Sequence, residues 1–594
     1  MHRSRFHHLA IVALLMLGAC QGATGRRGPQ TQVQDSSLLA GAVVGPTESP
    51  LDGAPPAVGP FVAAANPLAV EAGLGVLRRG GSAVDAAVAI QAVLGLVEPQ
   101  SSGLGGGAFM MVYDGTTHEV TAYDGRETAP ALVTPDLFQE SGQPLPFMEA
   151  VLSGRSTGVP GAVAMLGMAH GAHGVLPWRD LFGDAERLAR EGFVVSPRLA
   201  GMIALPTGQG HTPAATDYFT LPDGHRAVAG DVLTNPAYAQ TVTALASGGP
   251  SVLYHGPIAK AVVEAVQAGP RPGVLSETDL AGYRPIERGA LCRPFRIYVV
   301  CVPPPPSSGV ALLQLLAMAE VTPALEQGPA SAEAWVAFAQ LQRLMYADRD
   351  RYVGDPGFVG VPVEGLLDLD YVAGRAALAS GLTGAASAGT PPGGVLRGLD
   401  KTVEPGGTSH MVVVDAHGNA VSMTTTVESL FGSGRMAGGF FLNNQLTDFS
   451  FSPTLADGTA AANAVAAGKR PRSSMTPAII LDQQGRLVGA IGSPGGSSIL
   501  AYNAKAFIAA LIWGLPVQAA FDLPNLVAKG SGFGADTDRF SPELRQEMAE
   551  HGIVIQPNAS ENSGLHGALW RLGPNGWAWD GGADDRREGQ ARTQ

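Results

Sequence analysis

The pattern of apolar and β-branched positions predicts a β-hairpin in the second half of the chain. The run 410–414 is rich in apolar β-branched residues and the run 420–427 is rich in Val and Thr, and such residues favour strands. The connection between them, Asp-Ala-His-Gly-Asn, contains a glycine where a tight hairpin often needs one. If the first and last residues of this connection pair, Thr408 lies opposite Thr426, and Glu428 lies just beyond the open end.

Helical patterns dominate the chain after about residue 60. Asn66 followed by Pro67 predicts a helix start, because Asn caps well and Pro suits the first turn. That helix should end at Gly80-Gly81, and Ser82 with Asp85 forms a capping-box pattern for a second, Ala-rich helix. Further predicted elements are strands at 108–113 and 120–123 and helical segments at 178–191 and 334–352. The mixture predicts an α/β (α+β) fold.

The N-terminus has the pattern of an export signal. Residues 1–20 combine a basic start, an apolar run too short to span a membrane, and the ending Leu-Gly-Ala-Cys. This ending is similar to the bacterial lipoprotein box, in which the cysteine, here Cys20, is lipidated; the alternative is an ordinary signal peptide that contains a Cys. Gln21 then favours the outer membrane. Residues 21–58 are polar and rich in Gly and Pro, which predicts a disordered tether.

Composition narrows the classes of function. The 594 residues are 45% hydrophobic and 15% charged, which is enough for a large hydrophobic core. This length predicts either several domains or one large domain. A formal net charge of −13 argues against a nucleic-acid partner. The glycine-rich loop at 98–107 lacks the Lys-Ser/Thr ending of a phosphate-binding motif and the spacing of a dinucleotide motif, so we expect no nucleotide site there.

Thr408 can be an ordinary strand residue or a nucleophile. Gly406 and Gly407 precede it and leave its backbone accessible. A cut between Gly407 and Thr408 would give Thr408 a free α-amine beside its hydroxyl, which is a known activated nucleophile. Because the pKa of an α-amine is about 7.7–8.0, a useful fraction is neutral near pH 7 and can act as the general base.

Ten segments together carry a resemblance to a known family. The first five are GGSAVDAAVA, EPQSSGLGGGAF, DGRETAP, STGVPGAVAML and VPPPPSSGVALLQLL; the others are PGGTSHMVVVDAHGNAVSMTTT, NNQLTDFSF, GKRPRSSMTP, GSPGGSSI and GGADDRREGQA. They resemble, in order, the large-subunit and small-subunit signatures of the γ-glutamyltranspeptidase family. The resemblance covers about residues 60 to 591.

The resemblance implies an Ntn-hydrolase fold, a four-layer αββα sandwich built by two subunits of one self-cleaved precursor. The large subunit would be residues 59–407 and the small subunit residues 408–594, with Thr408 as the N-terminal nucleophile. Thr426 matches the threonine that hydrogen-bonds the nucleophile, in agreement with the hairpin register. Gly495 and Gly496 match the pair whose N–H groups form the oxyanion hole.

The resemblance also implies a pocket for a glutamyl group. Arg126 would bind the α-carboxylate with its bidentate guanidinium, and the hydroxyls of Ser473 and Ser474 would bind the same carboxylate. Gln445 and Asp448 would accept hydrogen bonds from the α-ammonium. Taken singly, each residue also has an ordinary structural explanation. Glu428 stands where the family usually has Asn; its charge would attract an ammonium and repel a nearby carboxylate. The segment 448–473 contains no Tyr, so a lid over the pocket is expected to be short or absent.

Cys292 and Cys301 are the only cysteines besides Cys20. In an oxidising compartment two cysteines often pair, and we expect a disulfide around a turn at Arg293-Pro294; free buried thiols are the alternative. Zinc is not expected, because no nearby His or Cys completes a ligand set.

The sequence thus predicts an exported, self-processing γ-glutamyltransferase and glutathione hydrolase that needs no metal and no other cofactor. Its partners would be a glutathione-like γ-glutamyl donor, and water or an amino acid or peptide as acceptor. The subunits would form a heterodimer in the bacterial periplasm, touching a membrane only through the lipid anchor. One alternative is a glutaryl or cephalosporin acylase of the same family, kept open by Glu428 and the thin lid. The other is a non-catalytic envelope lipoprotein, which would remain uncut.

Overall fold

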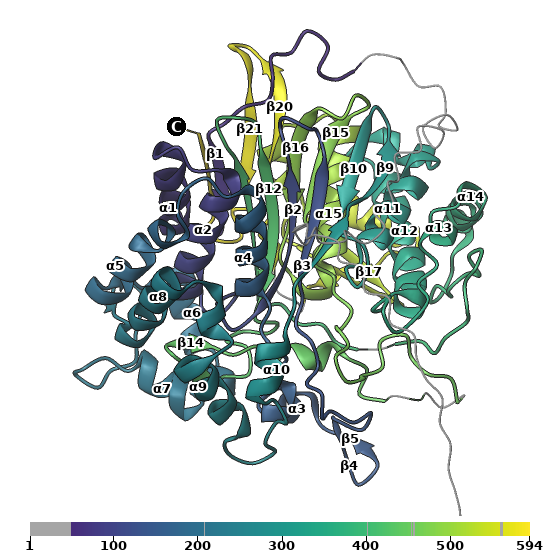
Figure 1. Ribbon diagram of the computed structural model, residues 1–594. Helices are drawn as coiled ribbons and strands as arrows, with labels where there is room; N and C mark the ends of the chain where they lie inside the picture. Colours follow the sequence, from purple (N-terminus) through teal and green to yellow (C-terminus); the bar gives the residue numbers. More distant parts are fainter. Residues whose placement is uncertain are drawn as a thin grey trace, which may run out of the picture. The chain divides into compact units, whose positions relative to one another are not determined.

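Two stacked β-sheets between two layers of helices form the centre of the protein (Figure 1). The computed structural model describes residues 49–206, 208–400, 402–452, 454, 458–558 and 562–593. The predicted signal peptide, Cys20 and most of the predicted tether lie outside the described residues. Among the described residues, no helix is long and apolar enough to cross a membrane.

The first sheet has seven strands contributed by both sides of the predicted cleavage site. In spatial order they are β22 (Gln590–Thr593), β1 (Phe61–Ala64), β11 (Thr408–Val414), β12 (Ala420–Thr426), β2 (Gly107–Tyr113), β3 (Val120–Gly125) and β8 (Ile286–Gly289). All neighbouring strands in this sheet run antiparallel.

The second sheet has six strands and is shared in the same way. In spatial order they are β21 (Gly576–Ala583), β20 (His566–Gly573), β16 (Leu487–Gly492), β15 (Ala478–Asp482), β10 (Tyr298–Val302) and β9 (Leu291–Phe295). Because each sheet contains strands from both predicted subunits, a cut before Thr408 would leave the two pieces joined through two continuous sheets.

Side-chain alternation along the strands separates the layers. In β1, Phe61 and Ala63 belong to the apolar core between the two sheets, whereas Val62 and Ala64 point to the outer helices, as the period of two in a strand requires. The helices outside the seven-stranded sheet include α1 (Pro67–Arg78), α2 (Ala83–Val97), α4 (Ala162–His173), α5 (Gly183–Glu191) and α8 (Pro236–Gly248). Those outside the six-stranded sheet include α11 (Gly309–Glu320), α12 (Ala332–Tyr352), α15 (Ile499–Phe507) and α16 (Val517–Asp522). The expected αββα architecture is confirmed.

Several local predictions are also confirmed. The Asn66 side chain accepts a hydrogen bond from the backbone N–H of Leu68, with Pro67 in the first turn of α1. Ser82 and Asp85 make the expected capping box at the start of α2. Both helices are predominantly buried, so their many alanines let them pack closely.

The predicted tether is too long at its C-terminal end. Leu51 is buried in the core beside the six-stranded sheet, and the indole N–H groups of Trp570 and Trp579 donate to the carbonyls of Pro55 and Val58. Residues 49–58 therefore lie against the folded domain. Their polar composition misled the prediction, because one buried leucine and two distant tryptophans hold them.

Cys292 and Cys301 are joined by a disulfide, which confirms the expected pairing. They lie opposite each other on neighbouring strands β9 and β10. The predicted turn at Arg293-Pro294 is wrong, because both residues belong to β9 and the chain reverses after Phe295. Pro294 is tolerated there because β9 is the edge of its sheet.

Candidate active site

The hairpin of β11 and β12 places two threonine hydroxyls together at its open end. Thr408 lies opposite Thr426 in the ladder, as the sequence predicts, and the Asp415 N–H donates to the Asn419 carbonyl across the turn. The two side-chain oxygens are 3.1 Å apart. Both residues are buried, and β12 is held on its other side by β2.

A chain of hydrogen bonds connects these hydroxyls to the carbonyl that precedes Thr408. The Thr426 hydroxyl donates to the Gly407 carbonyl at 2.8 Å and accepts from the Glu428 N–H at 2.8 Å. Its only proton is thus engaged, so the Thr408 hydroxyl is the donor between the two threonines. The Val427 N–H is shared between the carbonyls of Ser101, at 3.3 Å, and Gly407, at 3.4 Å. Two donors therefore polarise the carbonyl next to the Thr408 hydroxyl.

One of the two glycines predicted to form an oxyanion hole, Gly496, lines the same pocket as Thr408. Both glycines have positive φ, 132° at Gly495 and 55° at Gly496, and Gly496 belongs to the pocket wall. A Cβ at Gly496 would lie 2.4 Å from the Glu404 carbonyl oxygen, so glycine is required for this close approach. The Ser497 N–H donates to that same carbonyl at 3.1 Å.

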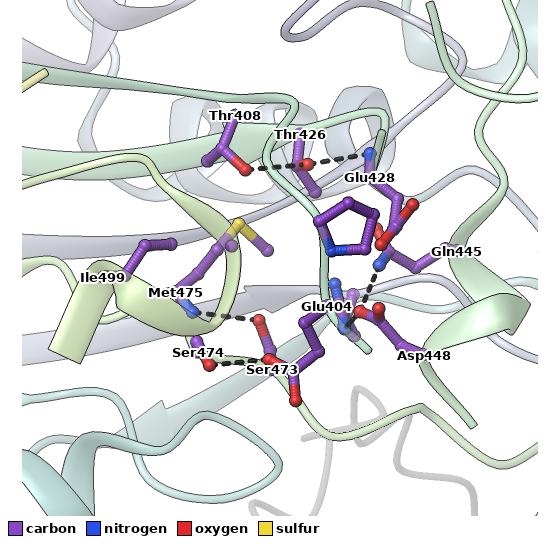
Figure 2. A pocket seen from close by; sticks show the side chains of 13 residues that line it. Glu404, Thr408, Thr426, Glu428, Gln445, Asp448, Ser473, Ser474, Met475 and Ile499 are labelled. Carbon is purple, nitrogen blue, oxygen red and sulfur yellow. Dashed lines mark hydrogen bonds and ion pairs between the residues drawn. The ribbon is translucent and has the colours of Figure 1, made fainter. Parts of the chain in front are cut away.

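A small pocket beside Thr408 is lined by most of the predicted residues. Figure 2 shows Thr408 and Thr426 on one side with Glu428 next to Thr426, and Ser473, Ser474, Glu404 and Asp448 on the other side. The lining residues are Arg126, Glu404, Pro405, Thr408, Thr426, Glu428, Gln445, Asp448, Ser473, Ser474, Met475, Gly496 and Ile499. Of the predicted catalytic and substrate-binding residues, only Gly495 is absent from this wall.

Arg126 and Asp448 form a buried ion pair on the pocket wall. The Arg126 Nη2 donates to Asp448 Oδ2 at 2.5 Å and to the Arg472 carbonyl at 2.6 Å, and Gln445 Nε2 donates to the same carboxylate oxygen at 2.6 Å. Burial raises the pKa of Asp448 to about 6, against the opposing charge of Arg126. Asp448 therefore changes charge in the range where an enzyme near neutral pH works.

Glu428 occupies a strained and buried position. Its φ is 84°, which is uncommon for a residue with a side chain, and Asn444 donates to one of its oxygens. Burial, together with the nearby Asp448, raises the pKa of Glu428 well above its usual range. Behind Arg126, burial also raises the pKa of Glu127 to about 8.

Three acceptor atoms on this wall receive no hydrogen bond from the described residues. They are Glu428 Oε1, Gln445 Oε1 and Asp448 Oδ1, and their residues all line the pocket. An ammonium carries three donors and no acceptor, so its chemistry complements this group. The wall is suited to hold a primary amine close to the two threonines.

Ser473 and Ser474 are both on the pocket wall, but their hydroxyls have different partners. The Ser473 oxygen accepts from the Met475 N–H at 3.1 Å. Ser474 donates to Glu404 at 2.6 Å and accepts from Arg349 at 2.6 Å. In the uncut chain the two serines therefore do not act as one pair.

The sequence interpretation missed several residues that shape this site. Arg587 donates to the Thr408 carbonyl at 2.8 Å and so positions the strand that carries the nucleophile candidate. Glu404, Arg349 and Arg472 form a buried ionic cluster beneath the pocket. Arg587 and Arg472 stand inside segments of the family resemblance, which was their only signal in the sequence. Among the described residues, no group of three or more His, Cys, Asp or Glu side chains is placed to hold a metal.

Comparison with known proteins decides the family. The family model described as gamma-glutamyltranspeptidase matches residues 69–593. The chain belongs to the γ-glutamyltranspeptidase family. It is 38% identical over 481 residues to a glutathione hydrolase proenzyme of Bacillus subtilis, covering 78% of this chain and 80% of that protein. It is 34% identical over 513 residues to the glutathione hydrolase proenzyme of Escherichia coli, covering 82% and 86%.

The fold of this family member also matches solved structures. A cephalosporin acylase from Bacillus halodurans superimposes with a TM-score of 0.78 at 26% identity, covering 91% of this chain and 96% of that one. The family, the Ntn-hydrolase fold and the class of enzyme expected from the sequence are confirmed. The non-catalytic alternative is thereby set aside.

Proposed function

We propose that this family member is a self-processing γ-glutamyltransferase and glutathione hydrolase whose nucleophile is Thr408. The observation that carries the proposal is the hydrogen-bond chain from Thr408 through Thr426 to the Gly407 carbonyl. The same hydroxyl opens onto a pocket with acceptors for an ammonium. The relatives named as glutathione hydrolase proenzymes support both the maturation and the donor.

Self-cleavage follows from the geometry of the uncut chain. The Thr408 hydroxyl attacks the Gly407 carbonyl carbon while Thr426 and the Val427 N–H stabilise the developing oxyanion. The Gly407–Thr408 C–N bond breaks, the nitrogen takes up a proton, and an ester to the Thr408 oxygen remains. Water hydrolyses that ester, which leaves a carboxylate on Gly407 and a free α-amine on Thr408. The products are a large subunit that ends at Gly407 and a small subunit that begins at Thr408.

The mature reaction uses the same hydroxyl. The Thr408 hydroxyl attacks the γ-amide carbonyl and passes its proton to the α-amine, which returns it to the leaving amine. The glutamyl group is then an ester on Thr408, and water or an acceptor amine releases it. In the structure Gly496 faces this space, and we assign the oxyanion contact of the mature reaction to the Gly495-Gly496 turn.

Donor recognition rests on charge. Glu428, Gln445 and Asp448 would receive the α-ammonium through the acceptor atoms described above, and Arg126 with Ser473 and Ser474 would act on the α-carboxylate. Burial and the nearby Asp448 hold Glu428 toward its neutral form, and an ammonium bound beside it would favour the charged form, as any close opposite charge does. This wall of carboxyl and amide oxygens therefore favours γ-glutamyl over glutaryl donors.

A paired rate assay tests this function. Purified protein without residues 1–20 is given γ-glutamyl-anilide and glutaryl-anilide, which differ only by the α-amine. We expect kcat/KM to favour γ-glutamyl by about tenfold or more, since a charge-assisted hydrogen bond contributes about 1.5–3 kcal/mol. Glu428→Gln should shrink that preference. A preference for glutaryl would instead assign the protein to the acylases.

The acylase is the second candidate, and one observation favours it. The cephalosporin acylase from Bacillus halodurans shares the fold over 91% of this chain. The acidic wall argues against it, because a glutaryl group has no ammonium to satisfy Glu428 and Asp448.

We further propose export and lipid anchoring at Cys20, with the catalytic domain in the bacterial periplasm at the outer membrane. The support is the basic start, apolar run and Leu-Gly-Ala-Cys ending of residues 1–20. Full-length protein should partition into the detergent phase and fractionate with membranes. Cys20→Ala should fail to enter the detergent phase, and an unchanged partition would contradict the anchor.

A further inference from the structure

A buried carboxylate of the chain itself stands on the wall of the active-site pocket. Glu404 precedes Gly407 by three residues, a span of about 10 Å at most, and its side chain is only 4% exposed. Its two oxygens accept from Arg349 Nη2 at 2.7 and 2.8 Å, and from Arg472 Nη2 and Ser474 Oγ at 3.0 and 2.6 Å. Every one of these contacts is charge-assisted.

The two arginines are hidden behind this carboxylate. Glu404 and Ser474 line the pocket, whereas Arg349 and Arg472 do not, and both arginines are about as buried as any side chain in the protein. Figure 2 shows Glu404 beside Ser474, on the side of the pocket away from Thr408 and Thr426. If Glu404 moved away, the guanidinium groups would become the floor of the pocket.

The charge count explains why this floor needs an anion. The cluster holds three cations, Arg349, Arg472 and Lys529, and three anions, Asp350, Asp400 and Glu404. Without Glu404 it would hold three cations against two anions. An uncompensated buried charge is strongly unfavourable, so the cluster would favour another carboxylate in the place of Glu404.

The backbone of the same segment packs against the glycine turn that lines the pocket. The Glu404 carbonyl accepts from the Ser497 N–H, and the carbonyls of Glu404 and Pro405 lie where a Cβ on Gly496 would be. Cleavage after Gly407 removes the covalent link that keeps the segment in place. Residues 404–407 can then move away from the arginines and from the Gly496 turn together.

We propose that Arg349, Arg472 and Ser474 form a carboxylate subsite in which Glu404 is an internal ligand of the uncut chain. After cleavage the α-carboxylate of the donor takes the place of Glu404. This inference rests on the proposed function, and it adds two arginines that bind the donor. It also makes the uncut chain unable to bind the donor until the Gly407–Thr408 bond is broken.

The occupancy of the subsite is tested by direct binding, without catalysis. Calorimetry compares L-glutamate and 4-aminobutanoate, which lacks the α-carboxylate, as ligands for cleaved protein and for uncut Thr408→Ala. Cleaved protein should bind L-glutamate at least about tenfold more tightly than uncut protein does. The uncut double variant Thr408→Ala/Glu404→Ala should recover that binding. Equal binding of L-glutamate to cleaved and to uncut protein would overturn the role of Glu404.

The role of the arginines is tested by kinetics with two donors. Arg349→Lys and Arg472→Lys should raise KM for γ-glutamyl-anilide by about tenfold and leave KM for 4-aminobutanoyl-anilide within about twofold. Arg375→Lys is the matched control, since Arg375 is also buried and paired, with Asp348, but does not line the pocket. Equal effects on both donors would overturn the subsite. If wild-type protein turns over neither donor, the proposed function fails, and the calorimetry still decides the subsite.

Discussion

The two sides of the pocket are built from opposite kinds of chemistry. The Thr408 side consists of neutral hydroxyls and backbone groups that converge on one carbonyl. The other side carries Arg126, Asp448 and Glu404, each already paired with a charged neighbour. One side is arranged around a bond to be broken, and the other around charges to be recognised.

This difference teaches how one pocket can serve two reactions. Self-cleavage needs no recognition of a separate donor, because the chain itself delivers the Gly407 carbonyl to Thr408. Transfer from a separate donor needs both sides, because the donor is not covalently attached to the chain and the charged side chains must bind it next to Thr408. Variants on the neutral side should therefore affect both reactions, and variants on the charged side should affect the second reaction alone.

The largest expected effect is that of Thr408→Ala. We expect a full-length chain on a denaturing gel and a loss of transferase activity on the order of 10⁴-fold or more, because both reactions use the same hydroxyl. Thr408→Ser keeps a hydroxyl and should still be cut. Two fragments from the alanine variant would contradict the assignment of the nucleophile.

Thr426→Val should slow self-cleavage by about 10²–10³-fold, the usual cost of one oxyanion donor. The change keeps the shape of the side chain and removes only the hydroxyl that donates to Gly407. Fragment appearance over time on a gel measures the rate. Thr424→Val is the control on the same strand, because Thr424 pairs with His410 instead. A similar loss in both variants would assign the effect to packing.

Arg126→Lys should raise KM for γ-glutamyl donors by about tenfold and leave self-cleavage unchanged. A lysine cannot reproduce the fork that contacts Asp448 and two backbone carbonyls. Steady-state kinetics and a gel time course measure the two effects. A slower self-cleavage would mean that the two sides of the pocket are not separable.

The smallest effect is expected from pH. Below about pH 6 Asp448 gains a proton and attracts the donor ammonium less, so kcat/KM for γ-glutamyl-anilide should rise as pH increases through about 6. Glutaryl-anilide has no ammonium and should show a weaker rise. The ratio of the two donors across pH 5–8 reports the carboxyl groups that face the ammonium, Asp448 and Glu428, and a ratio that does not change with pH would contradict their role in donor binding.

Prediction from the sequence was best where the information is local. The register of Thr408 with Thr426 follows from seven consecutive pairs counted back from one tight turn, and the capping box at Ser82 is contained within four residues. The Arg293-Pro294 turn failed because proline signals a turn in most contexts, but is also tolerated in an edge strand. Only the sheet order shows that β9 is such a strand.

The sequence by itself determined the family, the mixed helix and strand pattern, and the hairpin that brings two hydroxyls together. The charged floor was decided by tertiary structure. Glu404 meets Arg349, Arg472 and Ser474 across 55, 68 and 70 residues of sequence, and no periodicity links residues so far apart. Such a cluster forms only when helix α12, the segment before Thr408 and the loop before β15 pack together. A buried charge is energetically costly unless an opposite charge or a hydrogen bond compensates it.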